Sequence, residues 1–375
     1  MTSGPRAAAR TDMTDCIVVG AGLIGMLTAQ ALAGAGLKVT VLEKSRPARE
    51  SSWAGGGILS PLYPWRYPPA VNALARESQQ HYPDFCQQLL DSTGIDPQWT
   101  RSGLLIADIE DVSAVKQWAE RFADELIWPT AEEARELEPL LGIAPELSAW
   151  LPGVAQVRNP RLVQSLQAFV EQQGVEIRAQ CPAQGWKVSG RRVASVITPQ
   201  GDLSADHYVV AGGAWSRELL EATGIKLPIQ PVRGQMILFN GPPGLVSRIT
   251  LYQGHYAIPR RDGHVLFGST LEYTGFDKRT TAVARQELTR AAYELLPRLA
   301  ELPIEKHWAG LRPGSPDGTP AVGPHPDIDN LYINAGHFRN GVVLGLASAG
   351  LLADLLLQRP TALDAAPYLP ELFLK

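Results

Sequence analysis

The feature that most constrains this chain is the glycine-rich turn Gly20-Ala21-Gly22-Leu23-Ile24-Gly25, which follows the apolar run Cys16-Ile17-Val18-Val19. An amphipathic helical pattern comes after the turn and ends at Gly34-Ala35-Gly36, because glycine readily adopts the left-handed conformation of a helix C-terminus. The apolar run 37–42 is typical of a second strand, and Glu43 stands at its end. This order predicts a βαβ unit that binds a dinucleotide.

Each glycine of this turn has a physical role in such a cradle. Gly20 permits the tight turn, Gly22 lets the backbone approach a pyrophosphate, and Gly25 lets the helix pack closely on the strand. The helix N-terminus offers free N–H groups and the positive end of its dipole to the anion. Glu43 can accept hydrogen bonds from both ribose hydroxyls of an adenosine. The unit alone does not distinguish NAD from FAD, and a buried turn without ligand is the alternative.

A second glycine-rich turn, Ala335-Gly336-His337-Phe338-Arg339-Asn340-Gly341, lies near the C-terminus. It follows the strand-like run 331–333 and precedes an apolar run from Gly341 to Leu357. That run is short for a membrane span and carries Asp354, so we expect a buried helix that contacts a cofactor. Its N-terminus would stabilise the negative charge of a reduced flavin. The two turns together favour a flavin enzyme over a nicotinamide enzyme.

Composition narrows the functional classes. The chain has 375 residues, enough for two domains, and a net charge of −4, which gives no sign of nucleic acid or an anionic membrane surface as a partner. Its three cysteines are scattered, so we expect no disulfide framework, no metal site and a cytoplasmic location. Residues 1–12 lack the apolar stretch of a secretion signal and are interpreted as a disordered extension, with Met13 as a possible alternative start.

The patterning changes along the chain in a way that predicts two interleaved domains. Residues from about 229 to 271 alternate in the manner of antiparallel strands, and Asp262-Gly263 is a strong hairpin signal. The residues after about 72 have a helical pattern without any nucleotide signal. We therefore predict a cofactor domain built from residues 13–71, 151–220 and 308–375, and a substrate domain built from residues 72–150 and 221–307.

Two further glycine-rich segments are candidates for cofactor contacts. Ser51-Ser52-Trp53-Ala54-Gly55-Gly56-Gly57 is expected to form a backbone-rich loop that lies against a flat ring system, the alternative being a flexible surface loop. Ala211-Gly212-Gly213-Ala214-Trp215-Ser216 follows the strand-like run 207–210 and is expected near the adenosine.

These motifs occur in an order that resembles the D-amino-acid oxidase superfamily of FAD amine oxidases, and within it the bacterial glycine oxidases of thiamine biosynthesis. The more specific segments are Gly310-Leu311-Arg312-Pro313 and His337-Phe338-Arg339-Asn340, and the resemblance covers essentially everything after Met13. It implies an α/β fold in which a Rossmann-like FAD-binding domain is interleaved with an α+β substrate domain built on an antiparallel sheet.

The resemblance also implies roles for single residues. Arg312 matches the arginine that clamps the substrate carboxylate, Tyr256 matches a tyrosine that assists the clamp, and Arg339 matches a residue near the flavin pyrimidine ring or a second cation above the site. Leu271 falls where a methionine lines the small side-chain pocket in one relative. The cofactor-binding residues that we predict are Gly20, Gly22, Leu23, Ile24, Gly25, Glu43, Lys44, Ser51, Ser52, Ala54, Gly55, Gly56, Gly57, Ile58, Ala183, Ala211, Gly212, Trp215, His337, Arg339, Asn340, Gly341, Val342 and Leu344.

The chemistry of an amino-acid substrate agrees with these assignments. A guanidinium binds both oxygens of a carboxylate and resists rotation, so Arg312 suits the clamp. We expect it on a rigid turn beside Pro313, the alternative being an ordinary surface salt bridge. His337 is not assigned as a base, because an α-amino acid with a neutral amine can lose hydride directly. Leu271, Tyr273 or the 65–67 segment would cap the pocket.

The activity implied by the resemblance is oxidation of glycine, sarcosine or small D-amino acids to the imine, with oxygen reduced to hydrogen peroxide. The imine hydrolyses to glyoxylate and ammonia or passes to a thiazole synthase. No cysteine lies near residues 310–320, where one covalent attachment in related sarcosine oxidases falls, so we expect non-covalent FAD. Relatives imply a homo-oligomer, often a tetramer. The alternatives are a D-amino-acid dehydrogenase, a sarcosine oxidase-like enzyme and a non-catalytic flavin-binding subunit.

Overall fold

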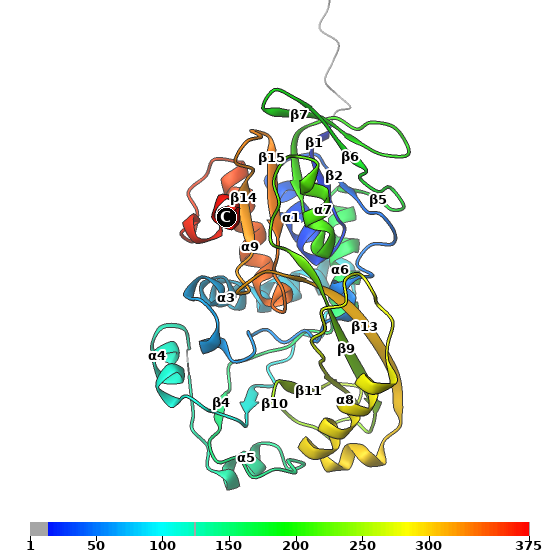
Figure 1. The fold of residues 1–375 in the computed structure, drawn as a ribbon. Helices are drawn as coiled ribbons and strands as arrows, with labels where there is room; N and C mark the ends of the chain where they lie inside the picture. Colours follow the sequence, from blue (N-terminus) through cyan, green and yellow to red (C-terminus); the bar gives the residue numbers. More distant parts are fainter. Residues whose placement is uncertain (1–13, 124, 375) are drawn as a thin grey trace, which may run out of the picture.

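The computed structural model describes residues 14–123 and 125–374, so the extension predicted for residues 1–12 lies outside the described residues. Two sheets form the frame of the molecule. In Figure 1 one sheet lies in the upper half and the other in the lower half, and helix α3 (Pro69–Thr93) crosses between them. The mixed α/β architecture with a separate, largely antiparallel sheet agrees with the predicted fold class.

In the described part of the chain, the upper sheet has six strands in the order β14-β15-β8-β1-β2-β5. The strands are β1 (Thr14–Val19), β2 (Val39–Leu42), β5 (Glu176–Arg178), β8 (Ala205–Val210), β14 (Ala321–Pro324) and β15 (Leu331–Ala335). All neighbours pair in parallel except β14 and β15. The central strands are continuous apolar runs because helices and loops cover both faces of a parallel sheet.

Four helices share one hydrophobic core on one face of this sheet. They are α1 (Leu23–Gly34), α3, α6 (Asn159–Gln172) and α9 (Gly341–Leu356). The other face is covered by the hairpin of β6 (Gly185–Ser189) and β7 (Arg192–Ile197) and by α7 (Ser216–Glu221). The apolar run after Gly341 is therefore a buried helix, as the sequence predicts.

The lower sheet has seven strands within the described residues, in the order β13-β9-β12-β11-β10-β3-β4. The strands are β3 (Leu104–Ile106), β4 (Ala149–Leu151), β9 (Gln230–Asn240), β10 (Ile249–Tyr252), β11 (His255–Pro259), β12 (His264–Gly268) and β13 (Ile304–Gly314). Neighbours are antiparallel except β10 and β3. Asp262-Gly263 lies in the turn between β11 and β12, as predicted.

Shorter elements complete the chain. They are α2 (Ser51–Ala54), α4 (Val112–Phe122), α5 (Ala131–Leu137), α8 (Ala282–Leu295) and the 3₁₀ turns η1 (Pro64–Arg66), η2 (Gly213–Trp215), η3 (Pro297–Glu301), η4 (Ala366–Tyr368) and η5 (Pro370–Phe373). Helix α8 packs on the lower sheet, where its leucines join a second core with the strand side chains.

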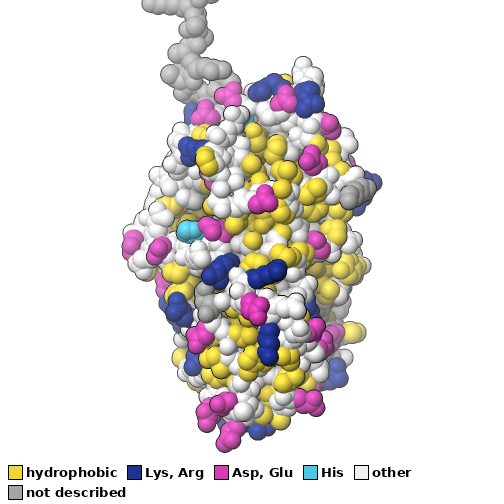
Figure 2. Space-filling view, turned by 90° about the vertical axis from the view of Figure 1, so that its left-hand side faces the viewer, with side chains coloured by type: hydrophobic (Ala, Val, Ile, Leu, Met, Phe, Trp, Pro, Cys, Tyr) yellow, Lys and Arg dark blue, Asp and Glu magenta, His cyan; other side chains and the backbone are white. Residues whose placement is uncertain are grey.

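No helix of the described residues has the length and apolar character needed to cross a bilayer. On the face in Figure 2, cationic and acidic side chains are interspersed.

Three local expectations need correction. Residues 51–54 form the short helix α2 instead of an open loop, and Arg312 lies inside strand β13 instead of on a turn. The segment after residue 72 is not only helical, since β3 and β4 join the lower sheet. Pairing between β13 and β9 continues through Arg312 opposite Val232, so tertiary pairing overrides the turn signal of Pro313.

Four elements lie across the predicted domain boundaries, namely α3, β4, α7 and β13. Helix α3 begins in the cofactor segments but packs, through the residues after 72, on α9 and α6 beneath the upper sheet. Strand β13 spans the boundary at residue 308 and pairs with β9 of the lower sheet. The chain returns to the upper sheet at β14. Strand β13 therefore connects the two halves of the molecule, whereas α3 packs with the upper half.

Candidate active site

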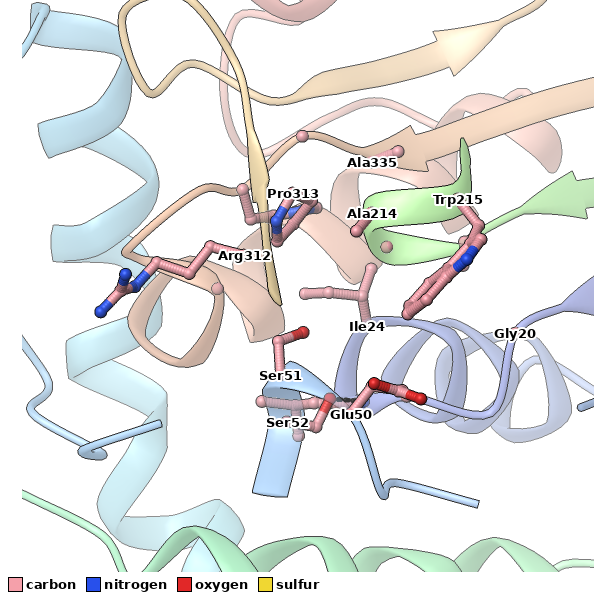
Figure 3. Close-up of a pocket in the computed structure, with 18 of the residues that line it drawn as sticks. Gly20, Ile24, Glu50, Ser51, Ser52, Ala214, Trp215, Arg312, Pro313 and Ala335 are labelled. Atoms are coloured by element: carbon pink, nitrogen blue, oxygen red, sulfur yellow. Dashed lines mark hydrogen bonds between the residues drawn. The ribbon is translucent and has the colours of Figure 1, made fainter. Parts of the chain in front are cut away.

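A cavity of about 420 Å³ lies where the carboxyl ends of β1, β2, β8 and β15 meet β11 and β13 of the lower sheet. Its volume is in the usual range for small-molecule and cofactor sites. Ligands of open α/β sheets bind outside the carboxyl ends of the strands, so the position is the expected one. Figure 3 shows Arg312 on one side of this cavity and Trp215 on the other, with Ile24, Ser51 and Ser52 between them.

The N-terminal turn is built by backbone contacts that exclude side chains. Gly20 has a φ of +113°, and a Cβ atom there would lie 2.5 Å from the carbonyl oxygen of Ala211. A Cβ atom on Gly25 would lie 1.8 Å from the carbonyl oxygen of Gly20. These contacts bring α1 against the strand ends, which is the close packing that the sequence predicts for this turn.

The N-terminus of α1 opens into the cavity. Gly22 is the N-cap residue and supplies no side chain, and the first turn carries no acidic residue. The N–H of Leu23 donates to the Ser52 hydroxyl over 2.8 Å. The helix dipole and the remaining N–H groups of this first turn therefore suit the pyrophosphate of a dinucleotide.

Glu43 and Lys44 lie at the end of β2 and line the same part of the cavity. The Glu43 carboxylate is buried, and it accepts hydrogen bonds from the N–H groups of Ala21 (3.0 Å) and Ser45 (2.9 Å). These bonds fix the carboxylate at the position expected for an adenosine ribose. The Lys44 ammonium lies 2.8 Å from the centre of the Trp215 ring, and burial lowers the pKa of Lys44.

The C-terminal turn supplies a second open helix end. Helix α9 begins at Gly341, its N-cap residue Asn340 makes no side-chain cap, and its first turn has no acidic residue. The side-chain amide nitrogen of Asn340 is buried without a hydrogen-bond partner among the described residues, and Asn340 lines the cavity. An unpaired buried donor beside free N–H groups fits the carbonyl oxygens of a flavin ring.

His337 lies in this turn but is held in one neutral state. It is 1 % exposed, and its Nε2 atom is 2.9 Å from the Ser348 hydroxyl. Burial lowers the pKa of His337 to about 3. The ring therefore stays neutral at physiological pH, which suits an orienting role and agrees with not assigning it as a base.

Arg312 extends from β13 into the other end of the cavity. Its guanidinium donates to the carbonyl oxygen of Thr270 (3.1 Å) and to the Ser269 hydroxyl (2.6 Å). A Cβ atom on Gly234 would lie 2.1 Å from its Nη1 atom, so the guanidinium rests on bare backbone. Within the described residues Arg312 forms no ion pair, which argues against the salt-bridge alternative.

Tyr256 and Arg339 complete this end of the cavity. Burial lowers the pKa of Arg312, Tyr256 opposes that shift, and the nearby Arg339 cation adds to it. The Tyr256 ring stands beside Gly56, where an added Cβ atom would lie 3.2 Å from it. Two cations and a hydroxyl thus meet at one end of the cavity, and this arrangement suits a carboxylate.

Most of the predicted cofactor residues line the cavity, and three do not. Gly25 packs against Gly20, Leu344 lies in the core under the upper sheet, and the carbonyl of Ala54 accepts from the Trp308 indole (3.1 Å). Leu271 and Tyr273, expected as pocket caps, are 45 % and 64 % exposed and lie outside the cavity lining. The 65–67 segment, the third candidate, also lies outside the lining, although Tyr67 is near enough to Arg312 to raise the pKa of its guanidinium.

Sequence reasoning missed several lining residues. They include Arg46, Arg49, Glu50, Ser60, Leu62, Gln184, Glu218, Leu219 and Phe338. Arg46 and Arg49 had a usable signal, because cations closely following the acidic end of β2 suit a phosphate-binding site. Phe276, which does not itself line the cavity, had no such signal: it stacks on the lining residue Trp215 with ring centres 5.2 Å apart, although it comes from the substrate half of the chain.

The sequence is similar to known proteins over nearly its whole length. The family model described as FAD dependent oxidoreductase matches residues 15–355. Glycine oxidase of Pseudomonas aeruginosa is 50 % identical over 355 residues, covering 94 % of this chain and 98 % of the relative. A bifunctional ThiO/ThiG protein of Trichormus variabilis is 32 % identical over 92 % of this chain and 53 % of its own length.

Solved structures agree with this likeness. The crystal structure of glycine oxidase from Geobacillus kaustophilus superposes with a TM-score of 0.90 at 28 % identity. The alignment covers 96 % of this chain and 98 % of that chain. The similarity therefore extends over both sheets and not only over the dinucleotide-binding part.

Proposed function

Because this chain belongs to the family of FAD-dependent oxidoreductases, we propose that it is a glycine oxidase that also accepts small amines such as sarcosine and small D-amino acids. The observation that carries the proposal is Arg312. Its guanidinium reaches the end of the cavity where α9 begins, and its hydrogen bonds within the described residues go only to neutral oxygens. The carboxylate of an amino acid is the partner that this cation lacks.

The residues present divide the work of binding and orientation. Arg312 binds the substrate carboxylate, and the Tyr256 hydroxyl donates a further hydrogen bond to it. The residues that hold FAD are those at the two open helix ends together with Glu43, and FAD when bound supplies the two-electron acceptor. The first N–H groups of α9 stabilise negative charge that develops at this end of the cavity.

The overall reaction converts glycine, water and oxygen into glyoxylate, ammonia and hydrogen peroxide. No residue of the site has to act as a general base, provided that the substrate binds with a neutral amine. The buried and neutral state of His337 agrees with this scheme, because that ring keeps a low pKa and is already paired with Ser348.

We test the proposal by visible absorbance of the purified holoenzyme without air. Glycine is expected to bleach the flavin bands, and air is expected to restore them with one hydrogen peroxide per cycle. Bleaching by sarcosine or D-alanine but not by glycine would show that the substrate is another amine and not glycine. Bleaching by glycine with no peroxide on adding air would indicate a dehydrogenase that uses another acceptor.

We further propose that FAD is held non-covalently. Cys16, Cys86 and Cys181 are free and buried, and none of them lines the cavity. Acid precipitation is expected to leave the yellow colour in the supernatant, and colour in the pellet would contradict it.

We also propose a thiazole synthase as the acceptor of the imine, which the ThiO/ThiG relative in a single chain supports. Co-purification of the two proteins, or glycine-dependent thiazole formation by the pair, tests this partnership. A cytoplasmic homotetramer remains our prediction for location and assembly, and sedimentation of the purified holoenzyme tests the assembly.

A further inference from the structure

A cluster of buried polar side chains lies behind Arg312, outside the cavity lining. Arg233 is 5 % exposed, and its guanidinium donates to the Oε2 atom of Glu272 over 2.5 Å and 3.2 Å. Gln235 is fully buried, and its amide donates to the Oε1 atom of Glu272 over 2.8 Å. The Glu272 carboxylate therefore collects donors from two residues of β9.

Thr270 connects this cluster to the active site. Its hydroxyl donates to the Oε1 atom of Glu272 over 2.5 Å and accepts from the backbone N–H of Gln235 over 2.9 Å. The carbonyl oxygen of the same residue accepts from Arg312 over 3.1 Å. Ser269, the preceding residue, accepts another hydrogen bond from Arg312 through its hydroxyl oxygen. Thr270 thus contacts both the Glu272 carboxylate, through its hydroxyl, and the Arg312 guanidinium, through its carbonyl.

Strand β9 contributes to both sides of this arrangement. Side chains alternate along a strand, so Arg233 and Gln235 point to one face of β9. Gly234 lies between them, and the guanidinium of Arg312 occupies the space on the opposite face where a side chain of residue 234 would be. Arg312 is therefore held between the Gly234 backbone and the 269–270 segment. A displacement of either support would shift the guanidinium, and small misplacements of binding groups lower catalytic rates strongly.

We propose that Glu272 is a positioning residue for Arg312. It fixes the Thr270 hydroxyl, and through it the carbonyl and the Ser269 hydroxyl that orient the guanidinium towards a carboxylate. The inference rests on the proposed function of Arg312 as the carboxylate clamp. It adds that affinity for carboxylates depends on a side chain that touches neither the substrate nor FAD.

The test is Glu272→Gln. Glutamine keeps the shape of the side chain, but its NH₂ group replaces one carboxylate oxygen and cannot accept a hydrogen bond. In the wild type one oxygen accepts from Arg233, and the other accepts from Thr270 and Gln235. The variant therefore loses one of these two sets of hydrogen bonds. The expected result is an approximately five- to twentyfold rise in both the KM for glycine and the dissociation constant of acetate, followed as an acetate-induced change in the flavin spectrum. FAD content is expected to match the wild type.

Asp277→Asn is the matched control. Asp277 faces the same Arg233, 3.3 Å from its Nη1 atom, and lies in the same segment, but its carboxylate accepts hydrogen bonds from Arg279 instead of Thr270. We expect nearly unchanged acetate and glycine affinities in this variant. Equal losses in both variants would mean that they only loosen the segment, and this would overturn the positioning role.

A third variant, Thr270→Val, removes the hydroxyl that joins Glu272 to this segment without removing a charge, and it is expected to weaken acetate binding. Thr270→Ser keeps a hydroxyl and is expected to retain the acetate affinity of the wild type. If Glu272→Gln lowers thermal stability but leaves acetate affinity unchanged, the residue is structural and the inference fails. If the wild type itself shows no response to acetate or glycine, the proposed function fails instead. The two failures are therefore distinguishable.

Discussion

The two ends of the cavity are built by different means. The cofactor end is made of backbone at glycine turns that each follow a parallel strand, as at Gly20 and Gly212. The substrate end is made of side chains, chiefly Arg312 and Tyr256, which extend from antiparallel strands. The cofactor end depends on the close approach of backbone segments at its glycines. The substrate end depends on the orientation of the Arg312 guanidinium by the hydrogen bonds around Thr270 and Glu272.

This difference determines how each end fails. At Gly20 and Gly25 of the cofactor end an added methyl group meets a backbone atom that cannot rotate away, so the expected damage is to packing and FAD retention. At the substrate end the loss of a side chain leaves the fold intact, because the partners of Arg312 are neutral oxygens and not charges.

The largest effect is expected for Arg312→Ala. The variant should keep FAD but lose about 2–5 kcal/mol of substrate binding, because the substrate carboxylate would enter the cavity without its cation. Its melting temperature is expected to equal or exceed that of the wild type, since a buried cation without an ion pair is removed. Steady-state kinetics with glycine and thermal unfolding check both statements.

The control for this variant is Arg298→Ala, which removes a half-exposed arginine paired with Glu301 and is expected to leave both measurements nearly unchanged. Unaltered glycine kinetics in Arg312→Ala would exclude the residue as the clamp.

The next effect is expected at the cofactor end, for Gly25→Ala. A Cβ atom at this position would lie 1.8 Å from the Gly20 carbonyl oxygen, so α1 must move away from the strand end. We expect a loss of about 3 kcal/mol of unfolding free energy, and FAD loss on gel filtration. Chemical denaturation and the flavin-to-protein absorbance ratio measure these changes.

Gly350→Ala provides a matched control on α9. It adds the same methyl group to a helical glycine where, apart from the helix's own backbone, no heavy atom of the described residues lies within 4 Å of the new Cβ atom, and it should stabilise the protein by about 0.5–1 kcal/mol. Equal destabilisation by both variants would show that the close approach at Gly25 is not the cause.

The same contrast explains what the sequence could predict. The cofactor end was predictable because each of its turns is contiguous: strand, glycines and helix follow one another, and Glu43 stands at a known spacing. Gly25, Ala54 and Leu344 belong to those motifs but not to the cavity lining, because a motif does not say which of its residues face the ligand.

The substrate end was only partly predictable. Arg312 and Tyr256 were found through resemblance to a family, whereas their supports at Gly234, Thr270 and Glu272 come from β9 and from the segment after β12. Such contacts between distant segments leave no local periodicity in the chain. Pro313 even suggested a turn, because strand pairing with β9 cannot be inferred from a proline alone.

A smaller effect is expected from the protonation of His337. The pKa of this histidine is about 3 in the folded protein and near 6.5 when unfolded, so the unfolded chain binds the proton more readily. Its contribution to stability is therefore present above pH 6.5 and is lost as the pH falls towards 3. Between pH 6.5 and pH 5 the loss is about 2 kcal/mol.

Denaturation curves of the wild type and His337→Gln at several pH values measure this effect. The variant, which has no proton to gain at this position, is expected to show a flatter decline of unfolding free energy below pH 6.5. Parallel curves would contradict a neutral, buried His337. The glycine pH profile between pH 5 and pH 8 should contain no step from this residue.

The smallest expected effect concerns Phe276, which joins the two ends. It belongs to the segment that begins with Thr270, yet it stacks on Trp215 at the cofactor end. Phe276→Ala removes one aromatic pair, worth about 0.5–1.5 kcal/mol, so the dissociation constant of FAD should rise about two- to tenfold. Tyr273→Ala, a more exposed aromatic of the same segment, is the control and should leave FAD affinity unchanged. If Phe276→Ala weakens acetate binding as strongly as FAD binding, the two ends are coupled through this segment, and the separation drawn between them fails.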